Sequence, residues 1–354
     1  MNNLDAYGWD ERLDTAWRAN AVPQCVPARV TADFGSSLTV VTPAEKTAVL
    51  SGRLQHFGRP EDFPKVGDWV AVLLSGEHAT IEAVLPRSSE IARRAAGHKA
   101  QKQIMATNVD IAFVLQALDN DFSPERLQRY LYQLTVGNIT PVLVLNKADK
   151  TNNVQPYIDA VSSLDVRTII ASAATGQGVD EIRQAIAAGK TAVLLGSSGV
   201  GKSTLTNLLL GQDAQQTQAV RESDDTGQHT TSHRELFMLP NGGLLIDTPG
   251  IRELQLWGAE EDLDENFDDV IALAAQCKYS NCRHGNEPGC QIQTALQSGK
   301  LKQAHYQNYL KMQGELKQQN AKPNTQGADQ KRKAQNKMYK QADRDMRADQ
   351  EFPH

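Results

Sequence analysis

Hydrophobic and polar residues alternate in five short runs within the first part of the chain. Alternation with a period of two is typical of strands with one buried face, and glycine, proline and serine mark turns between the runs. The predicted strands cover residues 28–32, 38–41, 47–50, 68–73 and 80–85. Five short strands at this spacing predict a small OB-type β-barrel, with Trp69 in its core. Such barrels bind RNA or dock proteins, and the pattern leaves both readings open.

A different pattern follows, in which apolar strands alternate with amphipathic helices. The predicted strands cover residues 109–115, 141–145, 167–171, 191–195 and 242–247, and the predicted helices cover 123–134, 154–164 and 204–209. This alternation predicts a mostly parallel sheet with helices on both faces. The polar stretch 212–235 has no apolar periodicity, and a loop of this length in a compact domain is either functional or disordered.

A glycine-rich loop stands between the strand at 191–195 and the helix that follows it. Its spacing is GxxxxGK[ST], the pattern of a phosphate-binding loop. In such a loop backbone N–H groups and the positive end of the helix face the phosphates, while Lys202 bridges the outer phosphates and the Ser203 hydroxyl binds Mg²⁺. The candidate phosphate-binding residues are Gly196, Ser197, Ser198, Gly199, Val200, Gly201, Lys202, Ser203 and Thr204.

The tetrapeptide Asn146–Asp149 (NKAD) comes directly after a strand, where ligands of α/β sheets bind. NKxD is the guanine-reading motif of GTPases. The Asp149 carboxylate can accept two hydrogens from the N1 and N2 edge of guanine, whereas adenine presents an acceptor there. We expect Asn146 to tie the loops together and Lys147 to lie over the base.

Two further loops complete the set expected of a GTPase. Ser172 and Ala173 follow the next strand and are candidates to meet guanine O6 through a backbone N–H. Asp247 and Gly250 belong to a DTPG sequence, in which the aspartate serves Mg²⁺ through water and the glycine N–H reaches the γ-phosphate. The motifs run NKAD, SAA, GSSGVGKS, DTPG along the chain, which is a circular permutation of the usual order.

Candidate switch residues lie between the phosphate loop and DTPG. Thr230 or Thr231 would be the second protein ligand of Mg²⁺, and the sequence does not decide between them. Ile251 stands where many GTPases place a glutamine that orients the attacking water. We therefore name His229 as the catalytic candidate beside Lys202, with a structural His229 as the alternative. Intrinsic turnover should be slow, with a partner expected to complete the site.

Near the C-terminus, a compact cluster of metal ligands follows the spacing Cys-x₄-Cys-x-His-x₅-Cys. The residues are Cys277, Cys282, His284 and Cys290. Three thiolates and one imidazole fill a tetrahedral Zn²⁺ shell without an open position, so we expect a structural site. Clustering of three of the four cysteines argues against a disulfide scaffold. Beyond a predicted helix at 300–316, the polar tail is expected to be flexible or an exposed helix.

The chain has 354 residues, of which 40% are hydrophobic and 22% charged, and its net charge is −5. This size predicts two or three domains of a soluble protein. No apolar run approaches the ~20 residues of a membrane span, and the polar start lacks a secretory signal pattern, so we expect a cytoplasmic location. Charge is uneven, because five Lys or Arg face one Glu between Arg87 and Lys102. That segment is either a solvated linker or a contact for phosphates.

The barrel, the permuted GTPase motifs and the Cys/His cluster together resemble the ribosome small subunit-dependent GTPase A family, over about residues 20–315. The resemblance implies GTP hydrolysis stimulated by the small ribosomal subunit, and a role late in the assembly of that subunit. The family's GxGxHTTT element corresponds to the stretch that contains His229, with Asp225 in place of the first glycine and Ser232 in place of the last threonine.

The predicted architecture is multidomain. An N-terminal OB-type β-barrel is expected over residues 1–90, a circularly permuted α/β P-loop GTPase domain over 91–265, a zinc-binding helical domain over 266–317 and a basic polar tail over 318–354. The predicted enzyme is a monomeric GTP phosphohydrolase with one structural Zn²⁺ and with Mg²⁺ bound alongside GTP. Its partners would be the small subunit and its rRNA, with no membrane. The alternatives are a ribosome-binding module whose docking is gated by nucleotide, and a P-loop ATPase or kinase, which NKAD opposes.

Overall fold

The computed structural model describes residues 3–20, 22–94, 102–211, 234–247, 258 and 260–320. Four predicted site residues lie outside this part of the chain: His229, Thr230, Thr231 and Gly250. Among the described residues, none of the helices combines the length and the hydrophobicity needed to cross a bilayer.

A closed barrel of five strands forms the N-terminal part, as predicted. The strands are β1 (Val26–Asp33), β2 (Leu38–Val41), β3 (Glu45–Leu50), β4 (Trp69–Ser75) and β5 (His78–Val84). They pair in the order β1-β2-β3-β5-β4, and β4 pairs again with β1 to close the barrel. Alternate side chains such as Val40 and Val72 fill the interior, which explains the period of two in the sequence. Trp69 is buried, as expected.

Short helices surround the barrel: η1 (Asn3–Tyr7), α1 (Glu11–Asn20), α2 (Gly52–Phe57) and η2 (Pro60–Asp62). Leu13 of α1 is buried in a cluster that also contains Trp69. The barrel part carries the two most exposed Phe, Tyr or Trp residues of the described chain. Phe57, the last residue of α2, is 84% exposed, and Phe34, directly after β1, is 52% exposed. The barrel therefore presents aromatic rings to solvent, although its tryptophan is in the core.

The central sheet contains β8 (Ile111–Ala117), β9 (Thr140–Asn146), β10 (Thr168–Ile170), β11 (Thr191–Gly196), β12 (Arg234–Met238) and β13 (Leu244–Asp247). Its order is β10-β9-β8-β11-β13-β12, and every neighbouring pair is parallel except β12 with β13. The prediction of a mostly parallel sheet is confirmed. β8 separates the strand before NKAD from the strand before the phosphate loop.

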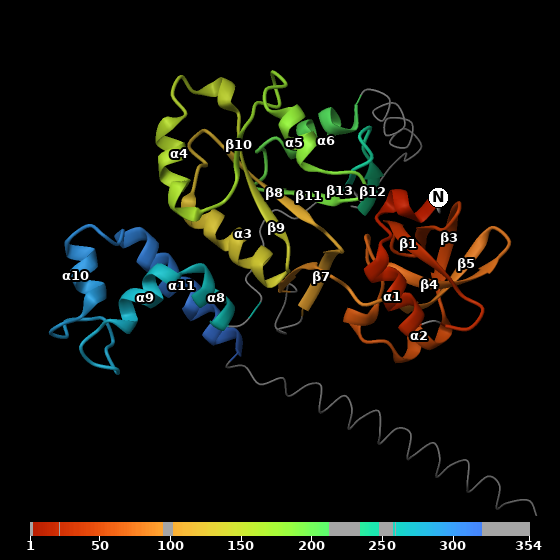
Figure 1. The fold of residues 1–354 in the computed structure, drawn as a ribbon, viewed down its shortest axis with the longest axis horizontal. Coiled ribbons are helices and arrows are strands. Elements are labelled where there is room, and N and C mark those ends of the chain that lie inside the picture. The colour runs from red at the N-terminus through yellow and green to blue at the C-terminus, as the bar shows by residue number, and fades with distance from the viewer. Residues whose placement is uncertain are drawn as a thin grey trace, which may run out of the picture.

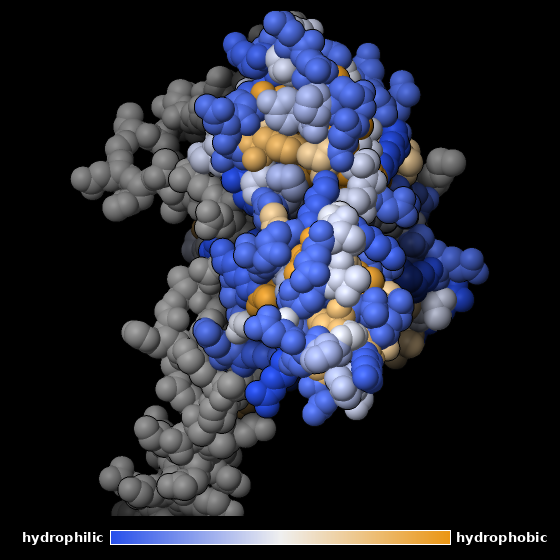
Figure 2. All heavy atoms as spheres, turned by 90° about the vertical axis from the view of Figure 1, so that its left-hand side faces the viewer, coloured by the Kyte–Doolittle hydropathy of each residue, from blue (hydrophilic) through white to orange (hydrophobic). Residues whose placement is uncertain are grey.

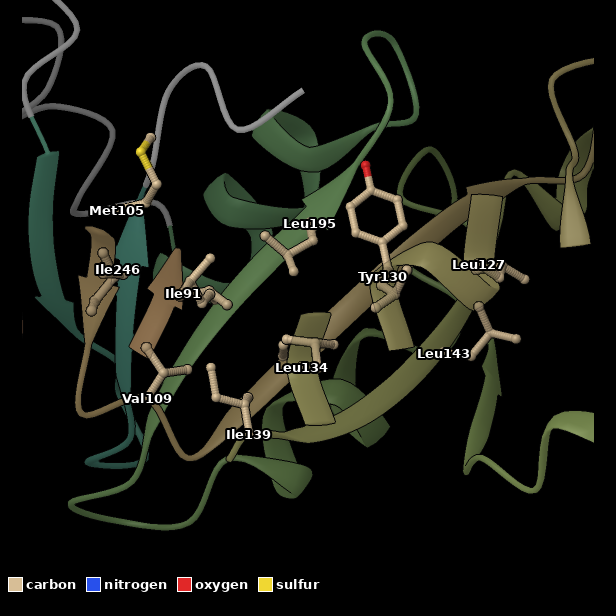
Figure 3. Packing of buried hydrophobic residues seen from close by; sticks show 14 of the residues in the cluster. Ile91, Met105, Val109, Leu127, Tyr130, Leu134, Ile139, Leu143, Leu195 and Ile246 are labelled. Carbon is tan, nitrogen blue, oxygen red and sulfur yellow. The ribbon is translucent and has the colours of Figure 1, made fainter. Parts of the chain in front are cut away.

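Helices cover both faces of this sheet: α3 (Pro124–Val136), α4 (Gln155–Val161) with η4 (Ser162–Leu164), α5 (Val179–Ala185) and α6 (Lys202–Leu210). One hydrophobic cluster lies between the sheet, α3 and α4 (Figure 3). The other lies between the sheet, α5 and α6. Neighbouring residues of β8 point to different clusters, Val114 to the first and Phe113 to the second, because side chains alternate along a strand.

The barrel and the central sheet form one continuous sheet of eleven strands. β1 pairs with β12, and buried Arg29 of β1 reaches the first residue of β11, donating to Thr191 Oγ1 at 2.8 Å. Burial lowers the pKa of Arg29 to about 10, although Asp110 and Asp68 oppose the shift. Arg29 therefore stays charged at neutral pH and joins the barrel to the strand that leads into the phosphate loop.

Within the basic segment 87–102, for which the sequence leaves open a solvated linker or a contact for phosphates, the described residues include β6 (Glu90–Arg94), which pairs antiparallel with β7 (Lys102–Thr107). Its flanking cations are paired within the protein. Arg87 donates to both carboxylate oxygens of Asp68 at 2.8 and 2.7 Å, and Lys102 forms an ion pair with Glu90. These two cations therefore stabilise the fold.

Within the described residues 260–320, the C-terminal part contains four helices: α8 (Glu260–Asn266), α9 (Asp268–Ala275), α10 (Gln291–Gln297) and α11 (Gln303–Asn320). Their hydrophobic cluster includes Tyr132 of α3, and Arg129 of α3 donates to both carboxylate oxygens of Glu315 at 3.2 and 2.7 Å. The C-terminal helices therefore contact α3, and in Figure 1 they lie at the left of the view while the barrel lies at the right. Hydrophilic residues cover most of the side seen in Figure 2, with small hydrophobic patches between them.

Candidate functional site

The predicted nucleotide motifs meet at one edge of the central sheet. NKAD begins at the last residue of β9, the Ser172–Ala173 pair follows β10, the phosphate loop begins at the last residue of β11, and Asp247 ends β13. These four strands are parallel, so their carboxyl ends lie along the same edge. Ligands of open α/β sheets bind at that edge.

Asn146 joins three of these loops. Its side chain is buried, with Nδ2 donating to the carbonyl oxygen of Val200 at 2.7 Å and Oδ1 accepting the N–H of Ala173 at 3.0 Å. Gly201 lies against the same amide, since a Cβ there would stand 2.4 Å from Asn146 Nδ2. The NKAD loop, the SAA loop and the phosphate loop are thus held together by one side chain. The Ala173 N–H is engaged in this contact, and its contact with guanine O6 stays a prediction.

The phosphate loop is shaped by glycine and closed by its lysine. Gly196 has a φ of +144°, and a Cβ there would lie 2.6 Å from the carbonyl oxygen of Leu115 on β8. Lys202 begins α6, and its Nζ donates to the carbonyl oxygens of Gly196 and Ser197 at 2.8 and 2.6 Å. The ammonium group therefore lies within the loop. Val200 is buried beneath it, whereas these members are exposed: Ser198, Gly199, Ser203 and Thr204.

On the side expected to bind the base, two charged residues are held in place. Asp149 Oδ1 accepts the Ser172 hydroxyl at 2.5 Å, and this hydrogen bond lowers the pKa of Asp149 below its usual value of 3.8. Lys147 has a φ of +63°, and its Nζ lies 2.9 Å from Asp119 Oδ2. Asp149 is consequently ionised at neutral pH, the state that accepts hydrogens from guanine.

Sequence reasoning missed the loop between β8 and α3. Asp121 Oδ2 accepts the hydroxyl of Ser197 at 2.5 Å, and Arg126 donates to both oxygens of the same carboxylate at 3.0 and 2.8 Å. Asp119 pairs with Lys147 from the same loop. One signal was available, because both acids follow the carboxyl end of a predicted parallel strand.

Ser203 and Asp247 are the two described residues predicted to serve Mg²⁺. Ser203 lies in the first turn of α6, the helix that follows β11, and Asp247 is the last residue of β13. β13 is the neighbour of β11 in the sheet. A hydroxyl and a carboxylate are oxygen ligands of the type that Mg²⁺ prefers, so the pair fits the ion.

The four predicted metal ligands come together: the ligand atoms of Cys277, Cys282, His284 and Cys290 all lie within 4.8 Å of one another. Cys277 Sγ is 3.5 Å from His284 Nδ1 and 4.0 Å from Cys290 Sγ. Cys290 Sγ is 3.6 Å from His284 Nδ1. Tetrahedral zinc, with Zn–S bonds of ~2.3 Å and Zn–N bonds of ~2.0 Å, has ligand–ligand edges of about 3.5–3.8 Å. The cluster therefore fits one tetrahedral ion.

Neighbouring groups support the cluster. The N–H of Gln291 donates to Cys277 Sγ at 3.4 Å, and the N–H of Gln293 donates to Cys290 Sγ at 3.5 Å. Gln293 Nε2 also donates to the carbonyl oxygen of His284 at 2.6 Å. Such donors offset thiolate charge and orient the ligands of a metal site.

Comparison with known proteins agrees with this geometry. A family model described as RsgA GTPase matches residues 84–257. A protein of Xanthomonas axonopodis pv. citri named small ribosomal subunit biogenesis GTPase RsgA is 41% identical over 326 residues, which cover 88% of each chain. The chain belongs to the RsgA GTPase family. A protein of the same name from Syntrophotalea carbinolica is 39% identical, with 89% of this chain and 90% of the relative covered.

Solved structures share the RsgA family fold. YjeQ from Thermotoga maritima has a TM-score of 0.61 at 24% identity, covering 82% of this chain and 98% of that one. YloQ, titled a circularly permuted GTPase, has a TM-score of 0.60 at 24% identity, covering 86% and 98%. An ABC transporter model also matches residues 179–347. That segment contains the phosphate loop but neither Asn146 nor Asp149 of the guanine motif. The relatives that match most of this chain are RsgA proteins, so the chain as a whole belongs to that family.

Proposed function

We propose that this member of the RsgA GTPase family hydrolyses GTP to GDP and phosphate, is stimulated by the small ribosomal subunit, and acts late in the biogenesis of that subunit. The observation that carries the nucleotide assignment is the buried Asn146 side chain, which joins the guanine motif to the phosphate loop. The names of the relatives supply the biological setting.

The base is read by Asp149. Its ionised carboxylate accepts hydrogens from guanine N1 and N2, and the acceptor on the corresponding edge of adenine would leave it unpaired. Ser172 orients this carboxylate through its hydroxyl. Lys147 lies over the base. Guanine O6 lies at the loop that begins with Ser172 and Ala173, whose own N–H groups donate to the Gln177 carbonyl oxygen and to Asn146 Oδ1 in the unbound protein.

The phosphates are held by backbone N–H groups of the phosphate loop, by the N-terminus of α6 and by Lys202. We assign the Mg²⁺ contacts to Ser203, to Asp247 through water and to Thr230 or Thr231, with the Gly250 N–H at the γ-phosphate. Bound Mg²⁺ would neutralise charge on the phosphate oxygens.

His229 orients or polarises the attacking water, because Ile251 has no group that could do so. We infer that the small subunit stimulates turnover by completing the site to which His229 belongs.

The remaining assignments concern architecture. We propose that the Cys/His cluster binds Zn²⁺ as a structural ion, since its closed set of four ligands leaves no position for substrate. The domains extend over 1–90, 91–265 and 266–317, with Leu263 of α8 packed into the hydrophobic cluster of the third domain, and a tail follows over 318–354. The protein works as a cytoplasmic monomer.

The deciding experiment measures GTP turnover with and without purified small subunits, for the wild type and for His229→Ala, with exposed His78→Ala as the control. We expect strong stimulation of the wild type and the control, none of His229→Ala, and unchanged nucleotide binding in all three. Stimulated turnover in His229→Ala would remove His229 from the mechanism. Slow wild-type turnover that subunits do not change would favour nucleotide-gated docking instead, and displacement of GTP by an equal concentration of ATP would refute the guanine assignment.

A further inference from the structure

The loop from the end of β8 to the start of α3 lies between the two halves of the nucleotide site. In the sheet, β8 has β9 with the guanine motif on one side and β11 with the phosphate loop on the other. A nucleotide whose base lies at Asp149 and whose phosphates lie at Lys202 must therefore cross the carboxyl end of β8. The loop carries one carboxylate for each side, Asp119 and Asp121.

Asp119 reaches toward the guanine side. Its Oδ2 lies 2.9 Å from Lys147 Nζ, and the N–H of Asp121 donates to its Oδ1 at 2.9 Å. The hydrogen bond from Lys147 lowers the pKa of Asp119, and the bond from Asp121 adds to the shift. The flexible lysine chain is thus held at both ends, by the left-handed backbone at Lys147 and by a carboxylate that is itself fixed.

Asp121 reaches toward the phosphate side. Its carboxylate accepts the hydroxyl of Ser197 at 2.5 Å and two bonds from Arg126 at 3.0 and 2.8 Å. Arg126 also donates to Oε1 of Gln116, a fully buried side chain on β8. The guanidinium neutralises Asp121, so the carboxylate can anchor the loop without placing an uncompensated negative charge beside bound phosphates.

We propose that Asp119 and Asp121 are positioning residues of the nucleotide site, Asp119 acting on the base through Lys147 and Asp121 acting on the phosphates through Ser197. The inference rests on the proposed binding of guanine nucleotide. Neither acid touches the nucleotide in this scheme. Each keeps its partner in the conformation that binds, so the ordering is complete before the ligand arrives.

A double-mutant cycle tests the Asp119 arm. Dissociation constants for the fluorescent analogue mant-GDP are measured for the wild type, Asp119→Asn, Lys147→Ala and the double variant. We expect Asp119→Asn to weaken mant-GDP binding about fivefold when it is the only substitution, the size expected for a partly exposed charge pair. In a protein that already carries Lys147→Ala, the same substitution should have no effect on binding. Asp119→Glu, which keeps the charge, should restore most of the affinity.

The same cycle with Asp121→Asn and Ser197→Ala tests the other arm, with an expected loss of about threefold that disappears beside Ser197→Ala. The control is Glu181→Gln, which removes an exposed ion pair with Arg167, the residue before the amino end of β10, and should leave affinity unchanged. Melting temperatures identify a variant that merely unfolds, and in that case Asp119→Glu and Asp121→Glu carry the test.

Equal losses in both backgrounds of a cycle would overturn the inference, because the acid would then not act through its partner. Wild-type affinity in Asp119→Asn and Asp121→Asn would overturn it as well, and would leave the proposed function standing. A wild-type protein that binds no mant-GDP would refute the proposed function itself.

Discussion

Replacing Asn146 with aspartate tests how the guanine motif is joined to the phosphate loop. The substitution keeps the size of the side chain and keeps Oδ1 as an acceptor for the N–H of Ala173. It replaces the Nδ2 donor with a second oxygen, which would face the carbonyl oxygen of Val200 at about the present 2.7 Å. Two acceptors then meet in a buried site.

The magnitude follows from the lost contact. A buried acceptor left without its donor costs ~1–3 kcal/mol. Burying a carboxylate beside that carbonyl adds to the cost, so we expect a total of about 3 kcal/mol. If the loops separate in the unbound protein, the nucleotide must supply this free energy to restore them. Since 1.4 kcal/mol corresponds to a factor of ten, affinity should fall about 100-fold.

The assay is titration of Asn146→Asp with mant-GDP, together with urea unfolding of the unbound protein. Asn153→Asp is a matched control, because Oδ1 of the exposed Asn153 only accepts the N–H of Gln155 and an aspartate oxygen can do the same. We expect the control to behave as the wild type. Asn146→Asp with affinity within about twofold of the wild type and an unchanged urea midpoint would show that the contact does not organise the site.

Three further outcomes are expected. Gly201→Ala should weaken mant-GDP binding about as much as Asn146→Asp, since its Cβ would lie 2.4 Å from Asn146 Nδ2 at a φ of +102°; the two losses should not add. The Ser172 hydroxyl lowers the pKa of Asp149, so the ionised carboxylate is lost only when the pH falls through this depressed pKa. Ser172→Ala removes the hydrogen bond, so mant-GDP binding should be lost at a higher pH than in the wild type. Metal analysis should find one zinc per chain. Cys282→Ser should lose the metal together with the far-UV circular dichroism signal of the C-terminal helices. Retained metal and signal would contradict a structural ion.

The position of α3 gives the nucleotide site a direct neighbour in the C-terminal part. Arg126 of this helix holds Asp121 beside the phosphate loop, and Arg129, one turn further, holds Glu315 of α11. Asn308 of α11 also donates to Gln128 Oε1 at 2.7 Å. α3 therefore contacts both helix α11 of the C-terminal part and the loop that we propose positions the nucleotide.

Local pattern was sufficient for the elements themselves. The period of two in residues 28–85 and the apolar runs at 141–145 and 191–195 predicted strands that the structure contains, because burial on one or both faces selects those residues. The GSSGVGKS loop and the Cys/His cluster were recognisable for a similar reason, since each occupies one short segment with characteristic spacing. The β6–β7 hairpin was missed, because its residues are largely polar and a register shift between Ile91 and Ala92 breaks the alternation.

Contacts between distant segments depend on the order of strands in the sheet, which short-range periodicity does not encode. Asp119 meets Lys147 and Asp121 meets Ser197 because β8 lies between β9 and β11. Arg29 has the sequence context of an ordinary strand residue, yet the tertiary structure buries it and places its guanidinium on Thr191, the first residue of the strand that leads into the phosphate loop. Motif chemistry is a property of neighbouring residues, whereas the anchoring of those motifs arises only when the chain brings remote strands together.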